Sequence, residues 1–262
     1  MTERGPLVVA RDGDLLTATL ADPERANALS PRLVGELTSL FVRNWRAEGV
    51  RAIVLAGEGK HFSAGADLAH LATLGAAGRE ENLADSRRLR DLFAAVLWQE
   101  ALTVALVQGS CVAGGCGLAT ACDFVVAAET ARFMYSEVRI GFVAALVATF
   151  LPLRVRGSDL RELLLAPRFV SATEALGIGL VNRVVPPEDL HRAGRSLAED
   201  VLTAASSESI ARTKRLLLAT LGRPLVESME LAAEANADAR LTADCRRGIA
   251  HFLEHKAPPR WR

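Results

Sequence analysis

The spacing of apolar and polar residues predicts alternating strands and helices over the first 150 residues. Apolar runs at Leu7–Ala10 and Leu15–Leu20 flank Asp12-Gly13-Asp14, a pattern typical of a β-hairpin. Ser30-Pro31 is expected to start a helix, because Ser is a good N-cap and Pro fits the first helical position. Strands are expected at Arg51–Ala56, Thr103–Val107 and Asp123–Ala127, and helices at Glu80–Gln99 and Leu118–Cys122. This alternation indicates an α/β fold.

The rest of the chain is expected to be mostly helical. Ile140–Leu153 is apolar but shorter than the ~18 residues that span a bilayer, so we expect a buried helix there. Ala69–Gly78 is rich in Ala and Gly and is expected to be mobile. A short strand is expected near Leu180–Val185, and helices at Glu188–Leu202, Ser207–Leu221 and Pro224–Leu253. We divide the chain into a core, residues 1–195, and a helical region, residues 196–262.

Composition excludes several classes of protein. The 262 residues include 31 basic and 31 acidic side chains, and half of the chain is hydrophobic, which excludes general disorder. A net charge of zero gives no support to nucleic-acid binding, and neither a signal peptide nor a membrane span is expected. The cysteines are Cys111, Cys116, Cys122 and Cys245. They form no CxxC pair, so a zinc site or a redox site is not expected. A cytoplasmic protein with reduced thiols is the simplest interpretation.

Two segments rich in small residues follow predicted strands. They are His61–Leu68 and Val107–Ala119, and the second also opens a helix. Small residues let a ligand approach the backbone closely, and free N–H groups at a helix N-terminus favour negative charge. Taken alone, each segment is equally well explained as a tight structural crossing. Neither matches a dinucleotide fingerprint, a P-loop or a GxSxG elbow.

Further short motifs occur in a fixed order around these two turns. They are Arg25-Ala26-Asn27-Ala28-Leu29, Phe62–Leu68, Ala113–Ala119 with Cys122-Asp123, Ala131-Arg132-Phe133, Ser136–Gly141, Gly179-Leu180-Val181 and Phe252-Leu253-Glu254. Each piece alone is weakly informative, but the ordered set covers essentially the whole chain and is highly specific. It resembles the enoyl-CoA hydratase/isomerase family, also called the crotonase family.

The resemblance implies a crotonase-like superhelix of ββα units with a C-terminal helical region that builds trimers, or hexamers from two trimers. It also implies a coenzyme A thioester as substrate, with no separate cofactor and no metal. Its oxyanion hole would be formed by the backbone N–H groups of Ala66 and Gly114. Two such donors stabilise the enolate that forms next to a thioester, and losing one typically costs ~3–4 kcal/mol.

The carboxylates depart from the family pattern. Hydratases that the chain resembles use two glutamates, of which one matches Glu137 and the other falls at Gly117. A single carboxylate suits a proton shuttle in double-bond isomerisation, whereas two carboxylates suit hydration. Apolar neighbours are expected to bury Glu137 and raise its pKa. A second acid would have to come from a substrate carboxylate or from one of Glu80, Glu81, Asp85 and Asp91.

Binding residues carry over from the same resemblance. Coenzyme A contacts are implied for Arg25, Ala26, Ala64, Asp67, Leu68 and, from a neighbouring subunit, Lys256. The acyl pocket is expected to include Leu71, Leu74, Tyr135 and Phe142. Surface charges and ordinary core packing explain these residues equally well. Ala144 stands where the family usually has Pro, which would loosen the segment behind Glu137.

Three functions are therefore considered. The first is a hydratase acting on a 2-enoyl-CoA, possibly a branched, methylglutaconyl-like thioester, with Glu137 as acid/base. The second is a Δ3,Δ2-enoyl-CoA isomerase that uses Glu137 alone. The third is a catalytically silent subunit that binds acyl-CoA. The sequence gives neither the acyl chain nor the choice between trimer and hexamer.

Overall fold

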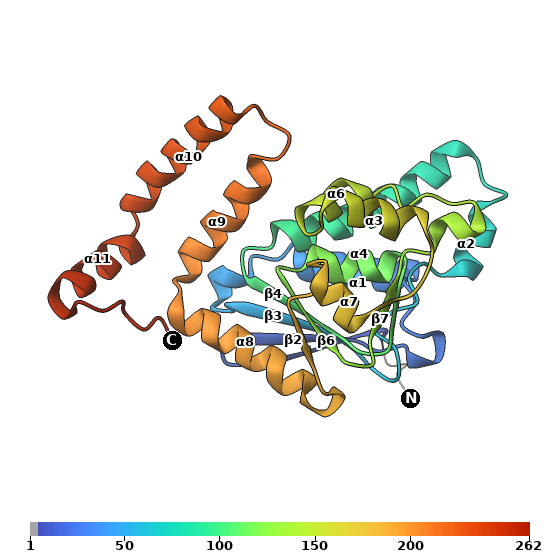
Figure 1. Cartoon of the computed structure of the whole chain (residues 1–262), viewed down its shortest axis with the longest axis horizontal. Coiled ribbons are helices and arrows are strands. Elements are labelled where there is room, and N and C mark those ends of the chain that lie inside the picture. Colours follow the sequence, from blue (N-terminus) through green and yellow to red (C-terminus); the bar gives the residue numbers. More distant parts are fainter. Residues whose placement is uncertain (1–4) are drawn as a thin grey trace.

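A six-stranded sheet forms the centre of the computed structural model, which describes residues 5–262 (Figure 1). The strand order is β1-β2-β3-β4-β6-β9; β1 and β2 form an antiparallel hairpin, and the other pairs are parallel. The strand bounds are Leu7–Asp12, Leu15–Leu20, Ala52–Gly57, Leu102–Val107, Phe124–Ala128 and Arg183–Val185. The α/β class and the hairpin predicted from the sequence are confirmed.

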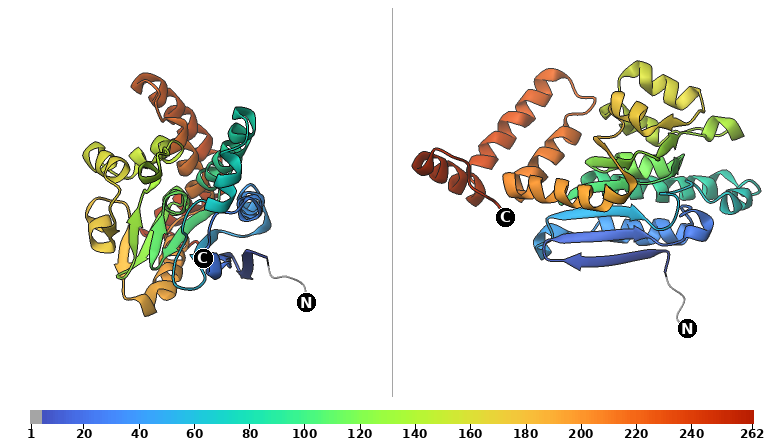
Figure 2. Two further views of the ribbon diagram at one scale, coloured as in Figure 1. Left: turned by 90° about the vertical axis from the view of Figure 1, so that its right-hand side faces the viewer. Right: turned by 60° about the horizontal axis from the view of Figure 1, so that its bottom comes forward.

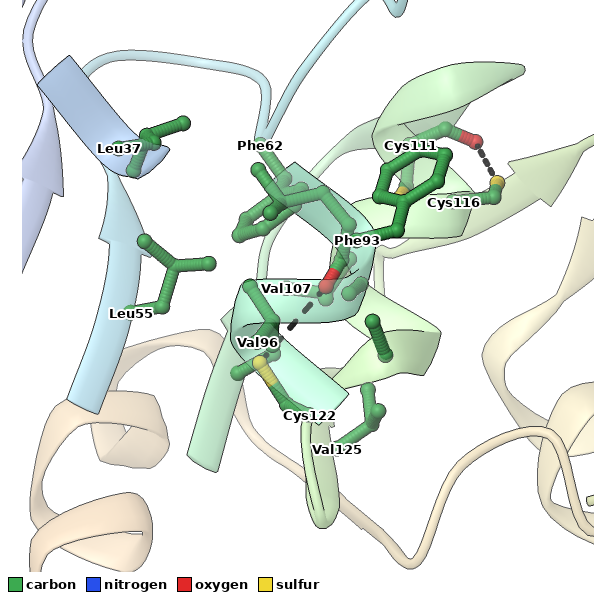
Figure 3. Close-up of a cluster of buried hydrophobic side chains, with 14 of the residues drawn as sticks. Leu37, Leu55, Phe62, Phe93, Val96, Val107, Cys111, Cys116, Cys122 and Val125 are labelled. Carbon is green, nitrogen blue, oxygen red and sulfur yellow. Dashed lines mark hydrogen bonds between the residues drawn. The ribbon is translucent and has the colours of Figure 1, made fainter. Parts of the chain in front are cut away.

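Helices cover both faces of this sheet. On one face α1 (Pro31–Phe41), α3 (Arg79–Trp98) and α4 (Gly114–Ala121) share the larger hydrophobic core with the strands. Figure 3 shows Leu37, Leu55 and Phe93 in this core. Because β3 and β4 are buried along their whole length, they are continuous apolar runs, as expected for central parallel strands.

The opposite face is covered by α8 (Leu190–Ala204), which shares a second core with β3, β4 and β6. Gly194 allows the close approach of α8 to β4. A Cβ atom at this position would lie 2.1 Å from Leu106 Cδ2, so a larger residue would force the helix away from the sheet.

A small second sheet brings two parts of the chain to one edge. It contains β5 (Ser110–Val112), β7 (Arg132–Met134) and β8 (Val170–Ser171), and β5 and β7 are parallel with Val112 opposite Met134. The Ala113 N–H also donates to the Met134 carbonyl (2.8 Å). Because parallel strands end at the same edge, the residues that follow β5 and β7 leave the sheet together.

The segment Ile140–Leu153, which follows β7, differs from the prediction. Ile140–Leu153 is not one buried helix: a 3-10 helix at Glu137–Ile140 ends at Gly141, and only Val147–Phe150 (α5) and the 3-10 turn Leu151–Leu153 are helical. Gly141 has φ +73°, a left-handed conformation that cannot continue a helix. The expectation of a continuous helix was wrong because an apolar run does not reveal such a stop.

The segment after the first small-residue turn also differs from the prediction. Leu68–Leu74 forms helix α2, where a mobile stretch was expected. Asp67 caps it by accepting hydrogen bonds from the N–H groups of Ala69 and His70 (2.9 and 3.2 Å). The Asp67 N-cap therefore favours a helix in a segment whose Ala- and Gly-rich sequence gave no clear sign of one.

A further difference concerns α4. The short helix expected at Leu118–Cys122 begins earlier, at Gly114.

The C-terminal helices form an arm that extends away from the sheet (Figures 1 and 2). Helix α9 (Ser207–Ala219) is followed by α10 (Leu225–Arg240) and α11 (Ala243–His255). The single long helix expected over Pro224–Leu253 is divided because Thr242 caps α11, accepting from the Cys245 N–H. The division of the chain at residues 195 and 196 stays a prediction.

The remaining elements are short. They are α6 (Gly157–Leu165), α7 (Ala172–Gly177) and 3-10 turns at Pro23–Arg25, Trp45–Glu48 and Pro187–Asp189. Within residues 5–262, no helix is both long and apolar enough to cross a membrane.

Candidate active site

The two small-residue turns pack directly against each other. The Val112 N–H donates to the Ser63 carbonyl (3.0 Å), and Ser63 and Cys111 form an isolated parallel bridge. A Cβ atom on Gly65 would lie 2.6 Å from the Val112 carbonyl oxygen, and one on Gly115 would lie 2.8 Å from the Ser63 carbonyl oxygen. The glycines are therefore needed because the two backbones touch here.

Replacing Gly65 by Ala is expected to lower the free energy of unfolding by about 3 kcal/mol, because it combines left-handed strain with a clash. Gly65 has φ +82° and its Cβ would strike the Val112 carbonyl. Gly141→Ala is the matched control: Gly141 has φ +73° but open space around its Cβ position, so its cost is about 1 kcal/mol. Denaturant unfolding measures both, and equal losses would contradict the close contact between the turns.

A buried asparagine holds the preceding loop against the first turn. The side-chain amide of Asn27 donates to the carbonyls of Glu58, His61 and Phe62 (3.0, 2.9 and 3.1 Å). The Ser63 hydroxyl in turn donates to the Asn27 carbonyl (2.8 Å). This explains physically why Asn occurs in the first motif: it satisfies carbonyls that the turn leaves without partners. The sequence motif contained this residue, but its role was missed.

The N–H groups predicted for the oxyanion hole lie side by side. A Cβ atom on Gly114 would be 4.0 Å from the Ala66 nitrogen, and Ala66 forms an isolated bridge with Leu29. Gly114 is the first residue of α4, so its N–H has no acceptor within the helix. The two N–H groups thus belong to neighbouring positions, and their role as an oxyanion hole stays a prediction.

The residue that sets the direction of the Gly114 N–H is strained. Ala113 has φ +48° and ψ −122°, a conformation that L-residues other than Gly rarely adopt. Its N–H group donates to the Met134 carbonyl, which helps to hold it there, and a Cβ atom on Gly65 would lie 3.0 Å from the Ala113 Cβ atom. Strain of this kind is common where backbone donors are positioned for a ligand.

Glu137 has the environment expected of a reactive carboxyl group. It is the first residue of its 3-10 helix and is only 9% exposed. Among residues 5–262, no group hydrogen-bonds to its Oε2 atom. Burial raises the pKa of Glu137, although hydrogen bonds from the backbone of Glu137 and Ser136 oppose the shift. A carboxyl group with an unused oxygen and a raised pKa is suited to exchange a proton with a ligand.

These groups open into one cavity of about 420 Å³ between α2, α3 and the segment after β7. Its wall includes Ala66, Gly114 and Glu137, so the structure brings the three predicted catalytic positions together. Ala64, Asp67, Leu68, Leu71 and Phe142 also line it. The remaining wall is mainly apolar, which suits a ligand with a hydrocarbon part.

Other predicted binding residues lie elsewhere. Leu74 and Tyr135 are buried in the protein interior and do not line the cavity, which corrects their assignment to the acyl pocket. Arg25 is exposed and forms an ion pair with Asp67 (3.6 Å). Ala26 lies behind the cavity wall, its carbonyl accepting from the Ala64 N–H (2.8 Å).

Lys256 lies outside the cavity of its own chain. It follows α11 at the end of the arm, whereas α2 lies at the opposite side of the molecule (Figure 1). Its expected contact with coenzyme A was assigned to a neighbouring subunit, and this stays a prediction.

The second glutamate of the family falls at Gly117 in this chain, and core side chains occupy the space beside Gly117. A Cβ atom on Gly117 would lie 2.8 Å from Phe93 Cζ and 2.8 Å from Val147 Cγ2. Both side chains also line the cavity, so apolar surface occupies the space that a carboxylate would need. Phe93 of α3 and Val147 of α5 therefore fill the space next to Gly117.

Polar residues at the cavity were only partly anticipated. Of the four candidate second acids, Asp85 lines the cavity, whereas Glu80, Glu81 and Asp91 do not. His70, Arg88 and Arg139 also line the cavity. His70 and Arg88 belong to none of the motifs, and Arg139 lies within the Ser136–Gly141 motif but was given no role. Within residues 5–262, no three His, Cys, Asp or Glu side chains are grouped as metal ligands.

Comparison with known proteins identifies the family. The enoyl-CoA hydratase/isomerase family model matches residues 11–262. A Thermus thermophilus protein named "Putative enoyl-CoA hydratase" is 46% identical over 255 residues, which are 97% of this chain and 100% of that protein. The mitochondrial Δ(3,5)-Δ(2,4)-dienoyl-CoA isomerase of Pongo abelii is 32% identical over 95% of this chain and 79% of its own.

Solved structures agree with this result. The crystal structure of an enoyl-CoA hydratase from Mycobacterium smegmatis matches with a TM-score of 0.91 and 31% identity, over 98% of this chain and 99% of that one. The crotonase-like fold expected from the motifs is thus confirmed. The chain belongs to the enoyl-CoA hydratase/isomerase family and is an enzyme of the hydratase or isomerase type.

Proposed function

We propose that this chain is a cofactor-free enoyl-CoA hydratase that adds water to a 2-enoyl-CoA thioester. The observation that carries the proposal is the position of Glu137: its buried carboxyl group, with Oε2 unused, shares one cavity with the N–H groups of Ala66 and Gly114. Asp67 and Leu68, from the same turn, would contact the coenzyme A part of the substrate.

The reaction follows from these groups. The ionised carboxylate of Glu137 takes a proton from water as the water oxygen bonds to C3 of the substrate. The C2–C3 π electrons move toward the thioester oxygen, and the two N–H groups stabilise the resulting enolate. Glu137 then returns its proton to C2, so atoms and charge balance with a single carboxyl group. No metal or redox cofactor enters these steps.

One observation favours a second candidate, a Δ3,Δ2-enoyl-CoA isomerase. Phe93 and Val147 fill the place of the second family carboxylate beside Gly117, which leaves one acid/base for the reaction. In isomerisation Glu137 would take a proton from C2 of a 3-enoyl thioester and return it to C4. The same two N–H groups would stabilise the dienolate intermediate.

Product mass distinguishes the candidates. Purified protein is incubated with 2-enoyl- and 3-enoyl-CoA thioesters, including a branched dicarboxylic one, and the products are analysed by mass spectrometry. A gain of one water from a 2-enoyl substrate supports the hydratase. Double-bond migration at constant mass supports the isomerase instead, and thioester binding without turnover would contradict both.

The pH dependence of kcat/KM is expected to show the raised pKa of Glu137. Because the base must be ionised in the free enzyme, kcat/KM rises as pH passes through this pKa. Burial places the midpoint above about 4.3, the ordinary value for glutamate. Initial rates across pH with a neutral acyl chain measure it; a midpoint at or below the ordinary value would contradict the proposed environment.

We also propose that the arm mediates assembly into a homotrimer or a dimer of trimers. Helix α10 has no buried residue in the single chain, and Leu225, Val226 and Met229 are 74%, 80% and 64% exposed. Apolar residues this exposed are usually covered in the assembled protein.

We further propose a cytoplasmic location for the protein. The four cysteines of the chain are free, as is usual for proteins of a reducing compartment.

A further inference from the structure

Helix α4 begins at Gly114, and an arginine from another segment binds its opposite end. The Arg154 Nε–H donates to the Thr120 carbonyl (2.6 Å). Nη2 of the same guanidinium donates to the carbonyls of Cys122 and Asp123. Because the last carbonyls of a helix lack donors within the helix, Arg154 supplies donors that α4 itself cannot provide. Positive charge at this end also complements the helix dipole.

The guanidinium of Arg154 is used for this helix end alone. Its three hydrogen bonds within residues 5–262 all go to these backbone carbonyls. The nearby carboxylate of Asp123 instead accepts from the N–H and hydroxyl groups of Thr103 (2.7 and 2.9 Å) and from Lys214 (2.6 Å). Burial lowers the pKa of Arg154, because it disfavours the charged form. A charge is therefore kept partly out of water in order to bind the end of α4.

Arg154 ends the stretch of chain that carries Glu137, and this stretch is attached to α4 along its length. Just before α4, the Ala113 N–H donates to the carbonyl of Met134, three residues before Glu137 (2.8 Å). Val147 of α5 lies against the middle of α4. Arg154 makes the attachment at the far end, about 12 Å along the helix. Two attached ends fix both the place and the direction of α4 relative to this stretch.

The backbone of Arg154 is itself held in place. Its N–H donates to the Leu151 carbonyl (2.9 Å), within the 3-10 turn that follows α5. Gly179, after α7, has φ +81°, and a Cβ atom there would lie 2.8 Å from the Arg154 carbonyl oxygen. The chain after α7 therefore packs closely on this backbone. Arg154 can act as a fixed support for α4 because its main chain is supported in turn.

We propose that Arg154 is a positioning residue for the reaction: by binding the C-terminal end of α4, it holds the Gly114 N–H in a fixed place relative to Glu137. The inference rests on the proposed function, which needs the thioester oxygen at Gly114 while Glu137 exchanges a proton at C2. Arg154 does not line the cavity, so it acts through α4 and not on the substrate. Groups that act together on one substrate need to be held within about 0.5 Å of their productive geometry.

Steady-state kinetics of three variants test the proposal. Arg154→Met removes the charge and the donors, and it is expected to lower kcat at least tenfold while KM changes less than threefold, because a misplaced N–H weakens transition-state stabilisation more than binding. Arg154→Lys keeps the charge without the guanidinium fork and is expected to recover part of the lost kcat. Arg156→Met is the control, because Arg156 is exposed and pairs with Asp159 (2.7 Å), and it should keep the wild-type kcat.

A spectroscopic measurement distinguishes this positioning role from a purely structural one. A saturated acyl-CoA that carries ¹³C at the thioester carbonyl is bound to each folded variant, and the carbonyl stretching frequency is measured by difference infrared spectroscopy. Hydrogen bonds to the oxygen lower this frequency, so the wild-type value is expected below that of the free thioester and the Arg154→Met value between the two. A helix cap without influence on the site would change only the free energy of unfolding, and would leave the frequency and kcat as they are in the wild type.

A folded Arg154→Met protein with wild-type kcat and carbonyl frequency would overturn the inference and leave the proposed function intact. If Arg154→Met does not fold, Arg154→Lys decides: a smaller change in the same direction supports the inference, and wild-type values of both quantities overturn it. If the wild-type protein converts neither 2-enoyl nor 3-enoyl thioesters, the proposed function fails, while the frequencies with the saturated ligand still test the placement of the Gly114 N–H. A wild-type frequency equal to that of the free thioester would overturn both.

Discussion

Replacing Glu137 by Gln is expected to lower kcat by about 10³-fold and to leave KM for the thioester nearly unchanged. Glutamine keeps the size and polarity of the side chain but cannot take a proton from water or from C2. Binding through the backbone N–H groups of Ala66 and Gly114 does not depend on this carboxyl group. Steady-state kinetics with the preferred thioester measure both parameters.

The same substitution is expected to raise the free energy of unfolding at neutral pH. The folded-state pKa of Glu137 is raised, so its contribution to stability is present at low pH and is lost as pH increases through that pKa. At pH 7 the buried, ionised carboxylate is therefore a cost that glutamine removes. Thermal unfolding of Glu137→Gln thus shows whether a loss of activity comes from the missing acid/base or from a less stable fold.

Glu129→Gln is the matched control for both measurements. Glu129 follows β6 and is exposed, so neither kcat nor stability should change. Full activity of Glu137→Gln would contradict the role of Glu137, and loss of activity together with lower stability would point to a structural role instead.

Restoring the second family glutamate through Gly117→Glu is expected to destabilise the protein by about 3 kcal/mol or more. The new side chain would strike Phe93 and Val147 and place a carboxylate among apolar atoms. We therefore expect lower stability and no gain in hydration rate. Denaturant unfolding and rates with one 2-enoyl thioester test both parts.

Gly35→Glu is the control for this experiment. Gly35 lies in α1 with open space at its Cβ position and is exposed, so a glutamate there should change stability little. A stable Gly117→Glu protein with faster hydration would show that Phe93 and Val147 yield easily, and it would contradict the filled site described here.

Local features of the fold could be predicted from the sequence because their causes lie within a few residues. Ser30 caps α1 by accepting from the Leu33 N–H, as its position before Pro31 indicated. Apolar runs such as Thr103–Val107 were recognisable as buried strands for the same reason. Ala66, Gly114 and Glu137 were located by motifs whose order is specific to the family.

Features that depend on distant residues could not be predicted. The contact of Gly117 with Phe93 and Val147 joins three helices, and the His70–Asp85 hydrogen bond joins two. The 3-10 helix that begins at Glu137 ends at Gly141 because Gly141 has a positive φ. The apolar composition of the segment gives no sign of this conformation. Phe142 lines the cavity, and its assignment to the acyl pocket stays a prediction.

The central claim is that the N–H groups of Ala66 and Gly114 bind the thioester oxygen next to Glu137. A crystal structure with a saturated acyl-CoA, which cannot be hydrated, tests this directly. The account predicts the thioester oxygen about 3 Å from both backbone nitrogens, with the Glu137 carboxyl group facing C2 and C3. A thioester bound outside this cavity, or turned so that neither N–H donates to it, would contradict the account.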